Sequence, residues 1–164
     1  MNKQQYEKWM NYWKTHPDRS RAVLFLDAQL TFCFVFAYAA LLYLSYGSEK
    51  FVPLLAVPGV AFLLLSGLRA WINGPRPSEV YGIPASVVRH QTGHSFPSRH
   101  AFSAFMIAFS AFYAGYFYFG LILTVLAVLV VFLRIILGLH FVADVCAGAL
   151  SAAAAALIGF VLIF

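Results

Sequence analysis

The sequence predicts an all-α integral membrane protein, a helical bundle of about five transmembrane helices preceded by an N-terminal interfacial helix. Of its 164 residues, 62% are apolar and only 10% are charged, and the mean hydropathy is +0.81. Soluble domains contain about 45–50% apolar and about 25% charged residues. The composition therefore excludes a soluble protein, and we expect the lipid bilayer, not a nucleic acid, to be the partner of its surface.

Five apolar runs are each long enough to cross a bilayer, which takes about 20 residues of helix. They cover residues 22–46, 51–72, 101–119, 121–139 and 141–164. Residues 101–139 are too many for one crossing, so we expect a tight turn between Tyr116 and Gly120. We treat residues 1–164 as a single membrane domain. A run of alanines at 152–156, with Gly148 and Gly159, predicts a face for close helix packing.

The N-terminal segment 1–21 is polar and mixed in charge. It carries Tyr6, Trp9, Met10 and Trp13 at helical spacing among lysines, a pattern typical of a helix that lies in the membrane interface. A frayed polar tail is the alternative. The segment lacks an apolar core and a small-residue cleavage site, so we expect the first apolar run to be retained.

The loop at 73–98 is interrupted by prolines and glycines, which exclude a long helix. Counting crossings places this loop, the end of the second span and the beginnings of the third and fifth spans at one membrane surface. We therefore expect the loop to border a pocket. Arg89, His90 and His94 in the loop either contact a ligand there or are solvated.

A cluster near the end of the chain contains Arg134, His140 and Asp144. The i, i+4 spacing places His140 and Asp144 on one helix face. The carboxylate can then hold one ring nitrogen and leave the other free to attack, so His140 is the candidate nucleophile. Arg134 lies six residues earlier, about 9 Å below the surface. The alternative is a His–Asp pair that only ties helices together.

A second cluster, Pro97-Ser98-Arg99-His100, precedes the third span. Proline and serine at this place indicate a helix start with Ser98 as its N-cap. The first N–H groups and the positive end of the helix dipole would then stabilise an anion. His100 can donate a proton to a leaving alkoxide. A histidine that merely caps the span is the alternative.

The remaining cluster, Arg69 and Arg76-Pro77, ends the second span. A planar guanidinium binds two phosphoryl oxygens at once, and phosphoryl transfer is catalysed largely by cations placed around the phosphate. Positive residues that only fix the membrane topology are the alternative. Convergence with Arg134 favours phosphate binding.

At these residues the chain resembles the type 2 phosphatidic acid phosphatase superfamily. The motifs of that family are Lys-x6-Arg-Pro, Pro-Ser-Gly-His and Ser-Arg-x5-His-x3-Asp. The resemblance, which runs from Arg69 to Asp144, implies a membrane phosphatase that acts through a phosphohistidine without metal or other cofactor. By position, it implies phosphate binding by Arg69, Arg76, Arg134 and Ser98, acid catalysis by His100, and nucleophilic attack by His140 with Asp144 as its partner.

Three positions depart from the family pattern. Arg69 replaces the lysine, Arg99 the glycine and Leu133 the serine. We expect residue 99 to have helical dihedral angles, so that the loss of glycine causes no strain, and Arg99 to add a phosphate or headgroup contact. Leu133 removes one hydroxyl donor. Members of the family usually have six spans, whereas this sequence predicts five.

The resemblance implies a substrate that is a membrane lipid phosphate, such as phosphatidylglycerophosphate, phosphatidate or an isoprenyl diphosphate, and a multi-pass protein of a bacterial-type inner or plasma membrane. Vanadate-dependent haloperoxidase chemistry, which the same superfamily site can support, is an alternative reaction, and the five apolar spans disfavour it. A non-catalytic phospholipid-binding or transport protein is the alternative from another class. Finally, Asp27 inside the first span invites a functional hypothesis, but we expect a purely structural pairing with Arg21 or with a neighbouring span.

Overall fold

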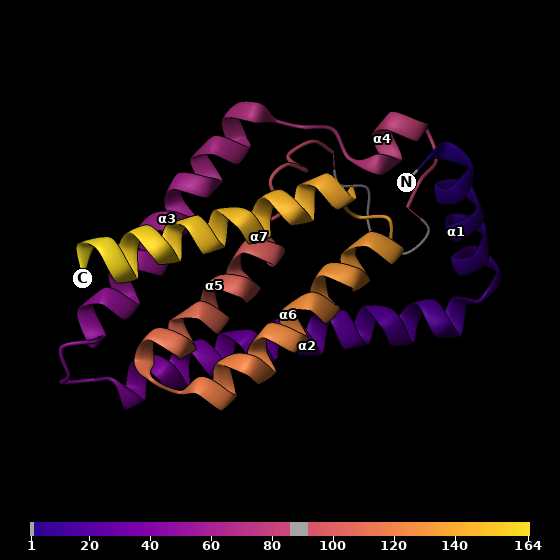
Figure 1. Ribbon diagram of the computed structural model, residues 1–164. Helices are drawn as coiled ribbons and strands as arrows, with labels where there is room; N and C mark the ends of the chain where they lie inside the picture. The colour runs from indigo at the N-terminus through magenta and orange to yellow at the C-terminus, as the bar shows by residue number, and fades with distance from the viewer. Residues whose placement is uncertain (1, 86–91) are drawn as a thin grey trace.

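The computed structural model describes residues 2–85 and 92–164, and all regular structure in these ranges is helical. Figure 1 shows helices packed side by side, with the C-terminus at one end of the bundle and the N-terminal helix at the other. The helices are α1 (Lys3–Thr15), α2 (Pro17–Leu44), α3 (Phe51–Ile72), α4 (Pro77–Tyr81), α5 (Arg99–Ala114), α6 (Phe117–Ile136) and α7 (Val142–Ala156), and α7 continues as the π-helical segment η1 (Leu157–Ile163).

All five predicted spans are helical. Within the described ranges, four segments are long and apolar enough to cross a bilayer, at 17–44, 51–81, 117–136 and 142–163. The remaining span, α5, has 16 residues. At 1.5 Å per residue it measures about 24 Å, less than the roughly 30 Å of a bilayer core. Helix α5 is therefore shorter than a full crossing, and the four longer segments make this protein a multi-pass membrane protein.

Helix α5 is the central element, because α2, α3, α6 and α7 all pack against it. One apolar cluster joins α5 to α2 and α6, and a second joins it to α3, α7 and η1. Large apolar side chains such as Phe36, Leu63 and Val125 point outward instead. This distribution is the one that a bundle surrounded by lipid requires.

The turn between α5 and α6 lies slightly earlier than predicted. Gly115 ends α5 with a φ of 97°, and α6 begins at Phe117. Only glycine adopts such an angle without strain, which explains why the helix stops there. Gly120, at the end of the predicted turn, lies inside α6 with the Phe112 ring against it.

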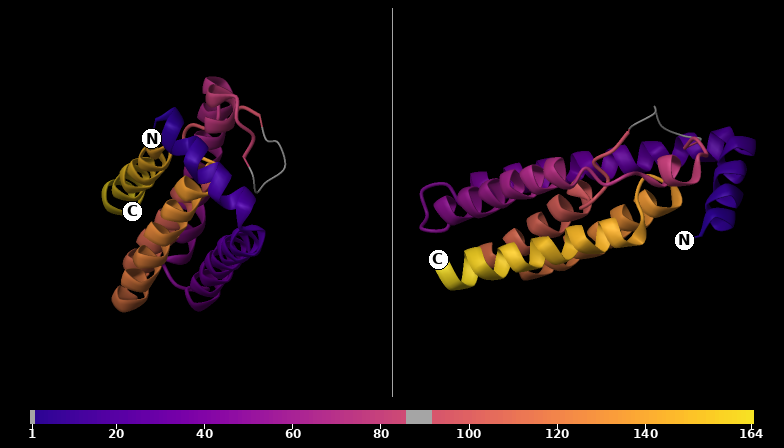
Figure 2. Two further views of the ribbon diagram at one scale, coloured as in Figure 1. Left: turned by 90° about the vertical axis from the view of Figure 1, so that its right-hand side faces the viewer. Right: turned by 90° about the horizontal axis from the view of Figure 1, so that it is seen from above.

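Helix α1 lies across one end of the bundle, as Figure 2 shows, so a frayed N-terminal tail was the wrong alternative. Tyr6 and Met10 are buried and lie against Gly138, the glycine that follows α6. Trp13 donates from Nε1 to the carbonyl oxygen of Ile136 at 2.7 Å. The helix thus covers the end at which α6 finishes; its position in the membrane interface stays a prediction.

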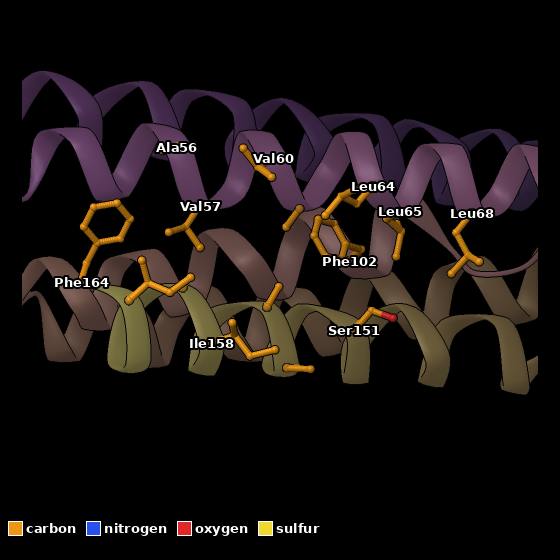
Figure 3. A pocket seen from close by; sticks show the side chains of 15 residues that line it. Ala56, Val57, Val60, Leu64, Leu65, Leu68, Phe102, Ser151, Ile158 and Phe164 are labelled. Atoms are coloured by element: carbon orange, nitrogen blue, oxygen red, sulfur yellow. The ribbon is translucent and has the colours of Figure 1, made fainter.

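A groove of about 550 Å³ lies between α3 and the α7–η1 segment (Figure 3). Its walls are apolar except for Ser151, and Val57 and Leu64 face Ile158 across it. Further along, Gly159 packs directly on Val57, as expected for a small-residue face. The groove carries no titratable side chain, so the polar chemistry of the protein lies elsewhere.

Gly148 sets the approach of α7 to α5. A Cβ at this position would lie 2.4 Å from the carbonyl oxygen of Ser98, a backbone atom that cannot move alone. We expect Gly148→Ala to lower the free energy of unfolding by about 1–3 kcal/mol, the usual cost of overpacking. Thermal unfolding in detergent measures this loss. Gly67→Ala is the control, because a Cβ there meets nothing within 4 Å; equal loss in both variants would contradict the prediction.

Candidate active site

The three polar clusters of the sequence meet at the end of the bundle that lies away from the C-terminus (Figure 1). Arg69 lies in the last turn of α3, Ser98 caps α5, and Arg134 lies in the last turn of α6. His140 follows α6, and Asp144 lies in the first turn of α7. The predicted convergence on one surface is therefore present.

The predicted His140–Asp144 pair is formed. Nδ1 of His140 lies 3.4 Å from Oδ2 of Asp144, and the two side chains are almost fully buried. The same carboxylate oxygen accepts a hydrogen bond from the backbone N–H of Phe141 at 2.9 Å. These contacts fix the carboxylate and orient the imidazole through one ring nitrogen.

Ser95 is a third member of this group, and sequence reasoning missed it. Its hydroxyl donates to Oδ2 of Asp144 at 2.5 Å and lies 3.2 Å from Nδ1 of His140. Ser95 is fully buried. The only signal in the sequence was its position two residues before Pro97, in the loop expected to border the pocket.

Ser98 joins the second cluster to the third. Its backbone N–H donates to the carbonyl oxygen of Asp144 at 2.9 Å, and its hydroxyl caps α5 through the N–H of Ala101 at 3.5 Å. The predicted N-cap is thus confirmed. Arg99 is the first residue of α5 and has a negative φ, so replacement of glycine introduces no strain, as expected.

Arg69 and Arg76 are buried and tie the loop to the bundle. Nη1 of Arg69 donates to the carbonyl oxygens of Ser95 at 3.1 Å and Pro97 at 2.6 Å. Arg76 donates from Nε to Gly93 at 3.1 Å and from Nη1 to Leu139 at 3.3 Å. Arginines that served only to fix the membrane topology would be solvated. These buried contacts therefore argue against a role of Arg69 and Arg76 in topology alone.

Arg99 and His100 line a cavity of about 330 Å³ whose other walls are mostly apolar. Both residues are exposed to it. His100 is within electrostatic range of His140, Arg69, Arg99 and Arg134. The remaining lining residues come from α2, α3, α5 and α6: Thr31, Phe34, Val35, Phe62, Ser103, Ala104, Ile107 and Val130.

Arg134 is paired with Asp27 of α2, at 2.9 Å between Nη2 and Oδ2. The neighbouring-span interpretation of Asp27 is therefore right, and pairing with Arg21 is wrong, because Arg21 lies near Asp18 instead. Leu133, in place of the family's serine, packs into the apolar cluster between α2, α5 and α6.

The predicted loop contacts are only partly described. His94 is exposed, and its backbone N–H donates to Oδ1 of Asn73 at 3.1 Å. Arg89 and His90 lie outside the described residues.

The fold and the site define a class of protein: a multi-pass helical membrane protein with a buried histidine–aspartate pair among arginines at one end. The family model of the PAP2 superfamily matches residues 50–164, and the chain belongs to this superfamily. This match confirms the resemblance found in the sequence motifs.

Two solved structures share the fold. The crystal structure of Aquifex aeolicus LpxE has a TM-score of 0.67 and 25% identity, and the match covers 87% of this chain and 92% of that chain. The structure described as the first transmembrane PAP2 type phosphatidylglycerolphosphate phosphatase from Bacillus subtilis has a TM-score of 0.62 and 24% identity, over 92% of this chain and 78% of that one. Comparison with the curated proteins finds no match.

Burial lowers the pKa of His140 below 6.5, although Asp144 opposes this shift, so the folded protein holds the imidazole neutral. The unfolded chain takes up a proton at this residue as pH falls through about 6.5. The free energy of unfolding should therefore decrease below that pH. We expect His140→Gln to show a shallower decrease between pH 7.5 and 5.5, measured by thermal unfolding in detergent. Equal slopes in both proteins would contradict this assignment.

Proposed function

We propose that this protein is an integral-membrane lipid phosphatase that hydrolyses the phosphomonoester or diphosphate of a membrane lipid through a phosphohistidine intermediate. The observation that carries the proposal is the position of Asp144. Its carboxylate faces His140. Its backbone carbonyl oxygen accepts a hydrogen bond from the N–H of Ser98, the residue that caps the helix bearing His100. These two contacts support a nucleophile and an acid that act on one phosphoryl group. Membership of the superfamily supports the same activity.

In the first step, the free ring nitrogen of His140 attacks the terminal phosphorus. With a phosphomonoester the bond from phosphorus to the lipid oxygen breaks; with a diphosphate the bond to the bridging oxygen breaks and the lipid monophosphate leaves. His100 donates its proton to the leaving oxygen. Arg69, Arg76, Arg99 and Arg134, with the Ser98 hydroxyl and the N-terminus of α5, hold the phosphoryl oxygens and stabilise the charge that develops on them. Asp144 stabilises the positive charge on His140.

In the second step, water attacks the phosphohistidine. His100, now without its proton, takes a proton from the attacking water, the phosphorus–nitrogen bond breaks, and inorganic phosphate leaves. His140 and His100 return to their starting states. The proton that His100 gives up in the first step is recovered in the second, so the cycle closes without another acid or base.

The walls of the cavity beside His100 favour a lipid substrate. Apolar side chains from α2 and α3, including Phe34, Val35 and Phe62, lie next to the charged Arg99 and His100. Such a cavity accepts a charged headgroup together with the adjoining hydrocarbon. Phosphatidylglycerophosphate, phosphatidate and isoprenyl diphosphates have this chemistry, and a bacterial-type inner or plasma membrane is where we place the protein.

We expect His140→Ala and His100→Ala each to abolish phosphate release from dioleoylphosphatidate in mixed micelles, because attack and proton donation are both lost. The loss should be at least about a hundredfold for the proton donor and larger for the nucleophile. Radiolabelled substrate should leave acid-labile phosphate on the wild-type protein quenched during turnover but none on His140→Ala. His16→Ala, an exposed histidine before α2, is the control. Retained lipid binding without any hydrolysis by the wild type would favour a phospholipid-binding or transport protein.

We also expect EDTA to leave the rate unchanged. In the part of the chain that the structure describes, no group of three His, Cys, Asp or Glu side chains could hold an ion together. The arginines supply the positive charge instead. Phosphate release before and after extensive chelation, with and without added Mg²⁺, measures this; a loss that Mg²⁺ restores would contradict the metal-free mechanism.

A further inference from the structure

The ion pair between Asp27 and Arg134 is unusual in two respects. It lies within the spans α2 and α6, and its side chains are only 9% and 12% exposed. Removing two charges from water costs several kcal/mol per ion, which a single contact does not repay unless the other hydrogen-bonding groups are satisfied. Here they are not: within the described ranges, Oδ1 of Asp27 and Nε of Arg134 are buried without a hydrogen-bond partner.

The pair lies beside the cavity that contains His100. Thr31, one turn after Asp27 on α2, lines this cavity, and so does Val130, one turn before Arg134 on α6. Arg134 is also within electrostatic range of His100 and of Arg76. Arg134 does not itself line the cavity, and its unpartnered N–H lies one helical turn from Val130, which does.

We propose that Asp27 is a positioning residue: it holds Arg134 through Nη2 so that the free Nε–H edge is presented to a phosphoryl oxygen. The inference rests on the proposed function, because it assigns a donor to the phosphate of that reaction. Asp27 lies on α2, outside the residues 50–164 that the superfamily model matches, so family membership gives it no role.

A purely structural link between α2 and α6 does not explain the arrangement. A pair of apolar side chains of similar volume would join two spans at least as well. The chain instead places a carboxylate on α2, which packs against α6, and within the described ranges it leaves one edge of the Arg134 guanidinium without a partner. An arginine that is hydrogen-bonded on one side and free on the other can donate its free N–H group to an anion.

The test uses the full-length protein in detergent and two measurements: the affinity for orthovanadate, read from its effect on thermal unfolding, and kcat/KM with dioleoylphosphatidate. Vanadate resembles phosphate and reports on binding without turnover. We expect Asp27→Leu to weaken both by about tenfold to a hundredfold, the value of one charge-assisted hydrogen bond. Asp27→Asn, which keeps an acceptor oxygen, should retain most of both.

Coupling to Arg134 separates positioning from a structural link. Arg134→Leu should show a similar loss, and the double variant Asp27→Leu/Arg134→Leu should be no worse than Arg134→Leu alone. Gln29→Leu, an exposed position two residues along α2, is the matched control and should change neither measurement. Losses that multiply in the double variant, or an Asp27→Leu protein that melts earlier but keeps both values, would overturn the proposal.

If the Asp27→Leu protein does not fold, the variant Arg134→Lys tests the same inference. Lysine preserves the buried ion pair with Asp27 but has no Nε–H edge, so vanadate affinity should still fall about tenfold; unchanged affinity overturns the inference. If the wild type binds vanadate with this pattern of variants but hydrolyses no lipid phosphate, the positioning role stands and the proposed function fails. A wild type that neither binds vanadate nor hydrolyses lipid phosphates would overturn both.

Discussion

The junction between the beginnings of α5 and α7 is the constraint on which the site depends. The N–H of Ser98 donates to the carbonyl oxygen of Asp144, and Gly148 allows the two helices to touch there. Because α5 and α7 both start at this end of the bundle, the positive ends of two helix dipoles meet in one place. This backbone geometry supports the proposed binding of an anion even before the arginines are considered.

The arrangement of carboxylates explains how so many positive side chains coexist near this junction. Arg69, Arg76 and Arg134 would repel one another in a medium of low dielectric constant. Asp144 and Asp27 offset part of this charge, and backbone carbonyl oxygens of the loop accept the remaining hydrogen bonds of Arg69 and Arg76. The loop is therefore held by the same groups that are proposed to bind phosphate, so its conformation and the charge of the site are coupled.

The sequence predicted the parts of this structure that follow from local pattern. Apolar runs located five spans, the i, i+4 spacing predicted the His140–Asp144 pair, and Pro97 with Ser98 predicted the start of α5. Contacts that require tertiary structure were not predictable in the same way. Ser95 reaches Asp144 only because the loop folds back over the beginning of α7, and no periodicity encodes that path. Asp27 was expected to pair, but the choice of Arg134 over Arg21 depends on how α2 packs against α6.

The departures at positions 99 and 133 are consistent with this packing. A serine at 133 would place its hydroxyl in the apolar cluster between α2, α5 and α6, where the structure has Leu133 at 4% exposure. The hydroxyl that orients the histidine–aspartate pair comes from Ser95 in the loop instead. Arg99, at the first position of α5, adds a cation to the lining of the cavity without disturbing the helix. The chain thus carries its orienting hydroxyl at the loop end of the bundle, next to Asp144, while the charge around the proposed phosphate site is kept.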